Sequence, residues 1–401
     1  MDAEEARTIG WRVRRIRDAR DKALRVIAGL AGISTTKLWR IEHGEYALDN
    51  RSEIVALANA LQISPSDLTK LPVPAPANGD TDAAVEKMRR VLMAVSHHHP
   101  QGEVLPVEVL REQVGVLIGA GSIGDQDLTG RELPVLIRNL YTTLAAGRDV
   151  AELLDLAAVL HTQATIGWLR TAGASVDLRE QAALLARRAA EEHDTATVWG
   201  LAAAGAVRVM LSMGAFDLAQ AELDSVTVPT TTPETMQLAG MLALYRAEVA
   251  AADSRPGDVD PALDFADELA ERTGEGNAYW LGFGPTNTRF CRVSVALDLK
   301  DYDMAVAAAE GVNPSLHSNR SRQAAYWAYY GRALARLRER HDDAVRALRQ
   351  AELIVPHRVQ RDPFVREVLA ELLVGSRRDA IGRELRGMVY RAGLSEEPSQ
   401  E

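Results

Sequence analysis

The stretch from Arg25 to Gly44, RVIAGLAGISTTKLWRIEHG, constrains the fold of this chain more than any other. Its apolar residues recur at helical spacing in two short runs, which Ala31-Gly32-Ile33 separates. Gly32 can adopt the left-handed conformation that a sharp turn between helices requires. Ser34 can cap the following helix, because its hydroxyl accepts a bond from an unpaired backbone N–H. The stretch therefore predicts a short helix, a tight turn and a second short helix.

The second of these helices has an inner and an outer face. Leu38 and Ile41 lie three residues apart and face inward, so the polar residues around them must point outward. Threonine, lysine and arginine on such a face are residue types that touch base edges and phosphates. The outward residues are Thr35, Thr36, Lys37 and Arg40.

This stretch resembles the lambda-repressor-like helix-turn-helix family, also called the xenobiotic-response-element class. The matching residues are Ala28, Ala31-Gly32-Ile33-Ser34, Leu38, Arg40-Ile41-Glu42 and Gly44, and the run from Ile54 to Leu68 fits the family's fourth and fifth helices. The resemblance covers about residues 8 to 71 and implies a five-helix domain, residues 1–71, that binds double-stranded DNA. An ordinary helical hairpin with a polar outer face is the alternative.

The resemblance also implies roles for individual residues. Bases would be read by Thr35, Thr36, Lys37 and Arg40, and phosphates would be held by Arg25, His43, Asn50 and Arg51. Family members often carry a phosphate-binding glutamine at the start of the first of the two helices. This chain has Leu24 there, so Arg25 is the expected replacement.

The charge distribution favours nucleic-acid binding by one end of the chain rather than by the whole chain. The formal net charge of the chain is −10. Residues 1–71 hold 12 Lys and Arg against 10 Asp and Glu, whereas the remainder holds 34 against 46. A basic N-terminal part on an acidic body suits a protein that presents one end to a polyanion.

The amino-acid composition limits the classes of protein to which this chain can belong. The chain is 47% hydrophobic and 25% charged, which is typical of a globular protein with a sizeable core. We expect no membrane span and no secretion signal, because no run of about eighteen apolar residues occurs and the N-terminus is polar. Cys291 is the only cysteine, which excludes an internal disulfide. A cytoplasmic location is the expectation.

Residues 72–82 are expected to be a linker. The segment LPVPAPANGD carries three closely spaced prolines and an Asn78-Gly79 turn signal, so it cannot form a continuous helix. Beyond it, residues 83–395 read as helices throughout, and alternating β-branched runs are scarce. The predicted fold is therefore all-α, with a helix-turn-helix domain followed by a helical repeat domain.

A repeat runs through the second half of the chain. In each copy a bulky residue precedes an alanine by three positions, and successive copies are 43, 43 and 39 residues apart. The small residue lets two antiparallel helices approach, and stacked pairs bury the apolar faces that one pair cannot bury alone. The pairs are Phe216/Ala219, Val259/Ala262, Tyr302/Ala305 and His341/Ala344.

This pattern resembles the tetratricopeptide repeat family, although the spacings exceed that family's period of about 34 residues. Another helical-hairpin solenoid is the alternative. A helix-turn-helix domain joined to such repeats resembles peptide-responsive quorum-sensing regulators and a set of actinobacterial regulators. The run Tyr279 to Asn287, YWLGFGPTN, particularly resembles the second group. These resemblances imply a homodimer that responds to a peptide or small-molecule effector.

A concave superhelix could hold that effector with aromatic rings and amide groups. Asn287 and Arg289 follow a Gly-Pro break and are polar where core packing does not require it, so they are the leading candidates. The further candidates are Asn277, Trp280, Phe283, Trp199, Tyr326 and Tyr330. The alternative is that most of these aromatics belong to the core between helices.

Two other signals are weaker. Gly119 to Gly124 satisfies a dinucleotide-binding fingerprint, but Gly130 and Pro134 argue against the long helix that should follow, so a helix end and a loop are expected instead. The run His97-His98-His99 cannot direct three rings at one metal ion from a helix. No cofactor and no metal site are expected.

Three hypotheses about function follow from the sequence. The first is a dimeric DNA-binding transcription regulator with an effector-binding repeat domain. The second is a scaffold whose repeats bind a protein partner, with the DNA-binding domain as a secondary anchor. The third is a nucleotide-dependent enzyme built around Gly119 to Gly124; apart from that segment no spacing points to catalysis, so we do not expect an enzyme.

Overall fold

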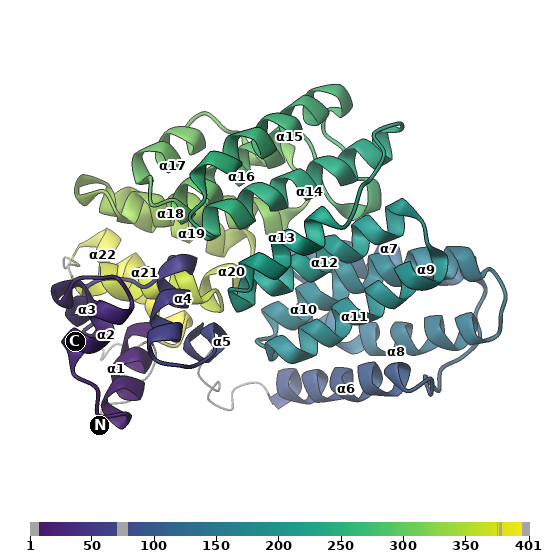
Figure 1. Cartoon of the computed structure of the whole chain (residues 1–401), viewed down its shortest axis with the longest axis horizontal. Coiled ribbons are helices and arrows are strands. Elements are labelled where there is room, and N and C mark those ends of the chain that lie inside the picture. The colour runs from purple at the N-terminus through teal and green to yellow at the C-terminus, as the bar shows by residue number, and fades with distance from the viewer. Residues whose placement is uncertain (1–7, 70–78, 375, 377–378, 395–401) are drawn as a thin grey trace.

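The computed structural model describes residues 8–69, 79–374, 376 and 379–394, and in these residues it contains helices and no strand (Figure 1). The all-α prediction is confirmed. We call residues 8–69 the head and residues 79–394 the stack. The head contains α1 (Ile9–Ala19), α2 (Leu24–Leu30), α3 (Thr35–Glu42), α4 (Arg51–Ala60) and α5 (Pro65–Thr69).

The predicted turn and cap between α2 and α3 are both present. Gly32 has a φ of +67°, and the Ser34 hydroxyl accepts a hydrogen bond of 3.1 Å from the Lys37 N–H. Leu38 and Ile41 lie in a small core shared by all five helices. The close approach of α1 to α3 requires glycine at position 10, because a Cβ there would lie 1.9 Å from the Ile41 carbonyl oxygen.

The first half of the stack runs through long helices that share one core. They are α6 (Gly79–Ser96), α7 (Val107–Ile123), α8 (Gln126–Ala145), α9 (Val150–Val159), a π-helical segment (Leu160–Thr165), α10 (Ile166–Thr171), α11 (Val176–His193) and α12 (Ala196–Met213). Because α6 begins at Gly79, the last four residues of the expected linker are helical, and the rest of it lies outside the described residues.

The second half consists of helix pairs and two closing helices, joined in places by short 3-10 turns. They are α13 (Phe216–Asp224), α14 (Pro233–Ala252), α15 (Val259–Thr273), α16 (Pro285–Asp298), α17 (Tyr302–Ala309), α18 (Arg320–Ala335), α19 (His341–Ile354), α20 (His357–Gln360), α21 (Pro363–Val374) and α22 (Ala380–Arg391).

The repeat pattern marks where the second helix of each pair begins. Phe216, Val259, Tyr302 and His341 are the first residues of α13, α15, α17 and α19. The alanine three positions later is fully buried in three of these helices, at Ala219, Ala305 and Ala344. The pattern thus reports close packing within helix pairs, and assignment to the tetratricopeptide family stays a prediction.

One expectation about α8 was wrong. Gly130 and Pro134 both lie inside this helix. Gly130 faces Trp168, and a Cβ at that position would lie 2.8 Å from the indole ring. Pro134 is buried in the same core, so tertiary packing holds α8 together across two residues that disfavour a helix locally.

One described helix, α12, is long and apolar enough to span a membrane by length and composition alone, and 56% of that window is buried inside the fold. In Figure 1 it lies in the middle of the stack, with α10 and α11 to one side and α14 to the other.

The chain folds back so that its last helices meet its first. In Figure 1 the yellow helices α21 and α22 lie beside the purple head, far from α9 toward the other end. The core also changes at α16: Cys291 and Val295 belong to the first cluster, whereas Phe290 and Val293 belong to a second that extends to α22. Ala47 of the head is part of this second cluster.

Candidate nucleic-acid interface and the cavity behind it

The outer face of α3 is open. Thr35, Thr36 and Arg40 are exposed, and α3 lies at the outer end of the molecule in Figure 1. Arg40 contacts two residues within the head: the carbonyl oxygen of Glu45 accepts a hydrogen bond of 3.2 Å from it, and its guanidinium lies 5.9 Å from the centre of the Tyr46 ring. Three of the four predicted base-reading residues are therefore free to meet a DNA groove.

Lys37, the fourth predicted base reader, is engaged within the protein. Its Nζ lies 2.7 Å from Glu53 Oε1 and 4.4 Å from the centre of the Tyr46 ring. Burial lowers the pKa of the Lys37 ammonium, but the Glu53 carboxylate more than offsets this and raises it. Lys300 of the stack reaches the same carboxylate at 2.6 Å, so Lys37 helps to join α3, α4 and the stack.

Apolar residues that the sequence pattern did not indicate also lie on the outer surface of the head. Trp39 is 43% exposed and stacks on His43 with ring centroids 4.1 Å apart, and Val26 and Leu30 are exposed on α2. Such side chains can contact thymine methyl groups and sugars. Arg25 and His43, predicted to hold phosphates, are both exposed at the same surface.

Four arginines in α1 or directly after it divide into two groups. Arg17 binds both carboxylate oxygens of Glu42, at 2.7 and 2.8 Å, and Arg12 donates to the Leu68 carbonyl oxygen at 2.6 Å. These two hold the head together. Arg15 and Arg20 are exposed and remain available to a polyanion.

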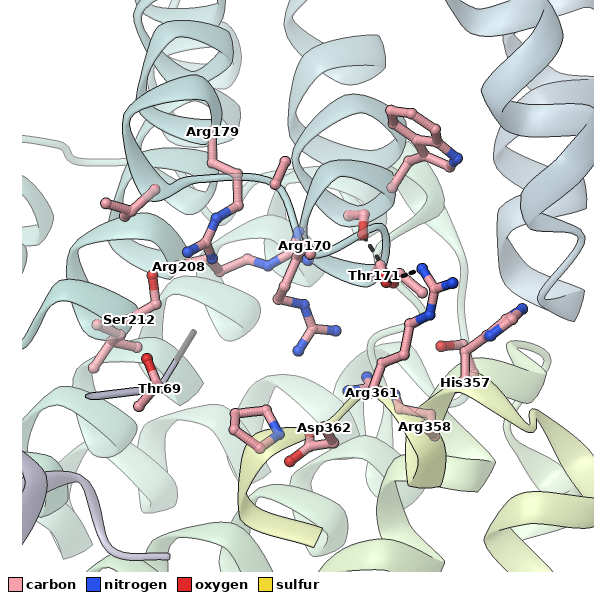
Figure 2. Close-up of a pocket in the computed structure, with 18 of the residues that line it drawn as sticks. Thr69, Arg170, Thr171, Arg179, Arg208, Ser212, His357, Arg358, Arg361 and Asp362 are labelled. Atoms are coloured by element: carbon pink, nitrogen blue, oxygen red, sulfur yellow. Dashed lines mark hydrogen bonds between the residues drawn. The ribbon is translucent and has the colours of Figure 1, made fainter. Parts of the chain in front are cut away.

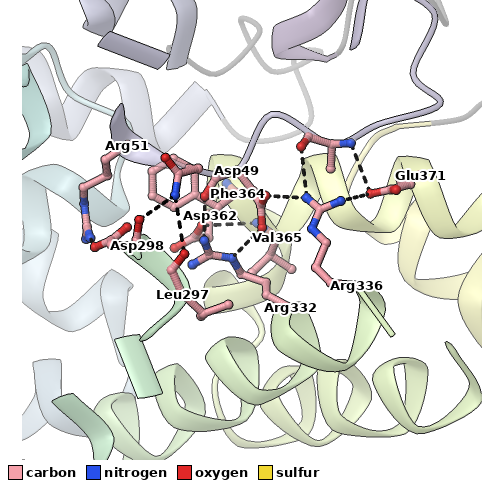
Figure 3. A network of polar contacts seen from close by, with 12 residues as sticks. Asp49, Arg51, Leu297, Asp298, Arg332, Arg336, Asp362, Phe364, Val365 and Glu371 are labelled. Carbon is pink, nitrogen blue, oxygen red and sulfur yellow. Dashed lines mark hydrogen bonds and ion pairs between the residues drawn. The ribbon is translucent and has the colours of Figure 1, made fainter. Parts of the chain in front are cut away.

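Asn50 and Arg51, the other predicted phosphate ligands, lie in the contact between head and stack, where Figure 3 shows Arg51 beside Asp298. The Asn50 side-chain amide donates to the carbonyl oxygen of Asp298 at 2.9 Å, and Arg51 pairs with the Asp298 carboxylate. Neither side chain is open to a phosphate in this conformation. Their partners lie almost 250 positions further along the chain, which the local pattern could not indicate.

Asp49 is the centre of this contact. Arg332 donates to its carboxylate at 3.2 Å, and Arg336 pairs with the same group (Figure 3). Burial raises the pKa of Asp49, but the two arginines outweigh that effect and hold it below its usual range. Arg336 also pairs with Glu371 at 2.7 Å, and that carboxylate accepts the Ala47 N–H at 3.1 Å.

A second contact closes the underside of the head. The Ile9 N–H at the start of α1 donates to Glu367 Oε1 at 2.6 Å, and both residues are buried. Burial raises the pKa of Glu367 to about 7. The head is therefore fixed to the stack through α16, α18 and α21, while the outer face of α3 is left free.

Most of the predicted effector-binding residues belong to the core. Phe283 is fully buried against Gly240, and Tyr326 is buried with its hydroxyl donating to the Ala309 carbonyl oxygen at 2.8 Å. Asn287 is buried too, with its amide 3.5 Å from the sulfur of Met241. These residues hold helices together rather than lining a large cavity.

The remaining candidates also lie apart from one another. Arg289 is exposed, Trp199 donates to Asp194 at 3.1 Å, and Asn277 accepts the Gly282 N–H at 3.1 Å within its own loop. Tyr330 is half-buried beside Tyr326. Of all eight candidates, Trp280 alone lines the large cavity described next.

A cavity of about 710 Å³ lies between the head and the stack. The α4–α5 region of the head forms one wall, and α10, α11, α12, α18 and α20 contribute to the others. Figure 2 shows Arg170, Arg179 and Arg208 reaching into the space opposite Arg358 and Arg361. No local sequence pattern indicates this cluster, because its members come from helices far apart in the chain.

The fingerprint at Gly119 to Gly124 is the end of a helix. α7 continues through Ile123, and Gly124 ends it in a left-handed conformation with a φ of +86°. No strand precedes it among the described residues, so the third hypothesis loses the strand–turn–helix setting that a pyrophosphate site of this kind needs. Likewise, no group of three metal-binding side chains is found in the described part of the chain.

Comparison with known proteins agrees with the geometry of the head. Residues 8–71 match a protein-family model described as a helix-turn-helix domain. Neither a search of curated proteins nor a search of solved structures gave a match. The head is thus a helix-turn-helix domain, the class of module that places a recognition helix in the major groove of DNA.

Proposed function

We propose that this protein is a transcription regulator that binds duplex DNA through α3 and carries out its control through the stack. The observation that supports this most is the selective exposure of α3. The segment from Asp49 to Glu53, which carries the other polar side chains nominated for DNA, is engaged with the stack. Thr35, Thr36 and Arg40 remain open.

A homodimer fits this proposal. A single small helix-turn-helix domain contacts few base pairs, and two heads on one symmetric dimer read two half-sites and multiply the affinity. We propose that the stack supplies the dimer contact and senses an effector. The fixed attachment of the head supports this, because a rigid joint can transmit a change in the stack to the spacing of the two heads.

The test begins with genomic footprinting of the purified full chain, which supplies a bound fragment. On that fragment we expect Arg40→Ala and Thr36→Ala each to weaken binding by about 1–3 kcal/mol, the usual cost of losing a base contact. Arg346→Ala is the matched control, since this arginine is exposed on α19 in the stack and far from α3 in sequence. Fluorescence anisotropy at several salt concentrations gives the affinities.

The same titration distinguishes a phosphate contact from the base contacts. Arg25→Ala should weaken binding to all sequences and reduce the dependence on salt, because a phosphate contact carries no sequence information. Equal binding by the wild type and by Arg40→Ala and Thr36→Ala would contradict the proposal.

A further inference from the structure

The cavity between head and stack carries an unusual excess of positive charge. Seven arginines line it against four carboxylates, although the chain as a whole has ten more acidic than basic residues. Arg51 is paired with Asp298. In the part of the chain that the structure describes, the other six form no ion pair with any carboxylate; they are Arg170, Arg179, Arg208, Arg322, Arg358 and Arg361.

These guanidinium groups have few partners of any kind. Arg208 donates to the Thr162 carbonyl oxygen at 3.0 Å, and Arg361 donates to the Thr171 carbonyl oxygen at 3.3 Å. The Nε of Arg179 is buried without a hydrogen-bond partner. Arg170 lies deep in the molecule, yet much of its surface is exposed to the open space of the cavity (Figure 2).

The cluster costs free energy in the absence of a ligand. The nearby Arg358 guanidinium, together with burial, lowers the pKa of Arg170 below its usual range. Burial, and after it the charge of Arg208, does the same to the pKa of Arg179. A fold gains nothing from gathering half-buried cations without counter-charges around one space, because their mutual repulsion is not offset. Such a cluster is typical of a ligand site.

The chemistry of the cluster indicates the ligand. Each guanidinium offers a planar fork of donors that matches two oxygens of a phosphate, and several forks around one space suit an anion with several charges. The cavity volume is within the range of small-molecule sites. Trp280, Leu281 and Phe364 provide apolar wall for the rest of such a molecule. We propose that this cavity binds a small molecule with two or more linked phosphate groups.

The position of the cavity connects this ligand to the head. Arg358 and Arg361 lie in and directly after α20, and α21 begins two residues later at Pro363. On α21, Phe364 packs under Arg51 and Arg332, and Glu367 and Glu371 hold the backbone of the head. An anion between Arg170 and Arg358 replaces repulsion with attraction. It draws α20 toward α10, and α21 and the head follow.

This second half of the inference, that the ligand changes DNA binding, rests on the proposed function. The first half, that the ligand binds, does not. Isothermal titration calorimetry of the full chain with inorganic pyrophosphate tests the first half. We expect saturable binding of one pyrophosphate per chain, weakened at least about tenfold in Arg170→Gln and in Arg358→Gln. Arg346→Gln, at an exposed site outside the cavity, should bind like the wild type.

Thermal unfolding without ligand provides an independent readout. The Tm of Arg170→Gln should be higher than that of the wild type, because the ligand-free variant has one fewer of the cations that repel one another in the cavity. Pyrophosphate should raise the Tm of the wild type and leave that of Arg170→Gln nearly unchanged.

The possible results distinguish the proposed binding site from the proposed effect of the ligand on DNA binding. Absence of saturation at millimolar pyrophosphate, or equal affinity in the wild type and both cavity variants, overturns the proposed site. If pyrophosphate binds in the cavity and leaves the affinity for the footprinted DNA fragment unchanged, the regulatory half is overturned. If the protein binds no DNA fragment at all, the proposed function fails while the calorimetry still decides the site.

Discussion

Single residues join the head to the stack, and Asp49 pairs with two arginines of the stack at once. Its carboxylate is buried between Arg332 and Arg336, so removing it leaves Arg332 without a counter-charge and Arg336 with Glu371 alone. We expect Asp49→Ala to destabilise the attachment by about 3–5 kcal/mol, the usual cost of breaking a buried ion pair on one side. Hydrogen exchange of α1 to α4 should become faster, while exchange in α12 and α14 should not change.

Asp217 provides the control for this prediction. It is exposed in the first turn of α13, where an acidic residue contributes only a favourable interaction with the helix dipole. Asp217→Ala should therefore change the exchange of the head very little. Unchanged exchange of the head in Asp49→Ala would show that the ion pairs do not hold it.

Glu367 makes the attachment sensitive to pH. Its pKa in the folded protein is about 7, above the value of 4.5 for a free glutamate, so the folded state holds the proton more tightly than the unfolded state. Its contribution to stability is complete below pH 4.5 and is lost as the pH rises to 7. The loss is on the order of 3 kcal/mol.

The measurement is urea unfolding of the wild type and of Glu367→Gln between pH 5 and about pH 8. The variant cannot lose a proton, so its stability should fall less over this range. Glu339→Gln, an exposed site, should follow the wild type. Parallel curves for Glu367→Gln and the wild type would exclude this residue as the cause.

The same residues show the limit of reading a sequence locally. The turn at Gly32, the cap at Ser34 and the buried positions Leu38 and Ile41 depend on neighbours within a few positions, and all were predicted correctly. The attachment of Asn50 depends on Asp298, almost 250 residues away. No periodicity or motif carries that information, and so the resemblance to a family assigned this residue to phosphate.

The helices, too, divide into features that nearby residues determine and features that depend on residues far away in the chain. The spacing of bulky and small residues located the starts of α13, α15, α17 and α19, because helix pairs pack through nearby turns. The interior of α8 was misjudged, because the Trp168 ring that accommodates Gly130 comes from another helix. The arginine cavity was missed for the same reason, since five helices of the stack bring its residues together.

Helix packing in the stack can be tested with two glycines that differ only in their surroundings. In α14, a Cβ at Gly240 would lie 2.1 Å from the Phe283 ring, which is fully buried. Gly240→Ala should destabilise the protein by about 1–3 kcal/mol through overpacking. In α7, a Cβ at Gly119 would meet nothing within 4 Å, so Gly119→Ala should stabilise it by about 0.5–1 kcal/mol.

Urea unfolding of both variants gives the comparison, and opposite signs are the expected result. Gly119 is also the first glycine of the dinucleotide-like segment. A stable Gly119→Ala protein with unchanged pyrophosphate affinity would agree with a helix end, whereas loss of that affinity would show that the end of α7, whose Gly121 and Ser122 line the arginine cavity, takes part in the phosphate site.

At the scale of the whole molecule, the chain joins its two ends. The helix-turn-helix domain at the start is held by α16 and α18 of the repeats and by α21 after them, so most of the stack lies between the head and its anchor in sequence. A change in the curvature of the stack therefore affects the contact between head and stack by two routes. One route runs through α16 and α18, and the other runs through α20 and α21.

This joint leads to a prediction about DNA geometry. In the proposed dimer, a rigid attachment sets one distance between the two α3 helices and so favours one half-site spacing. Arg332→Gln with Arg336→Gln loosens the attachment from the stack side and leaves every residue of the head unchanged. We expect the wild type to select one spacing from a library in which the half-site separation varies. The double variant should accept several spacings, with a lower affinity for the best one, because freeing the heads adds an entropy cost to binding.

Analytical ultracentrifugation establishes first that both proteins are dimers. The control is the double variant Arg338→Gln with Arg346→Gln, which changes two exposed arginines of the stack. Identical spacing profiles for all three proteins would show that the joint does not set the distance between the heads.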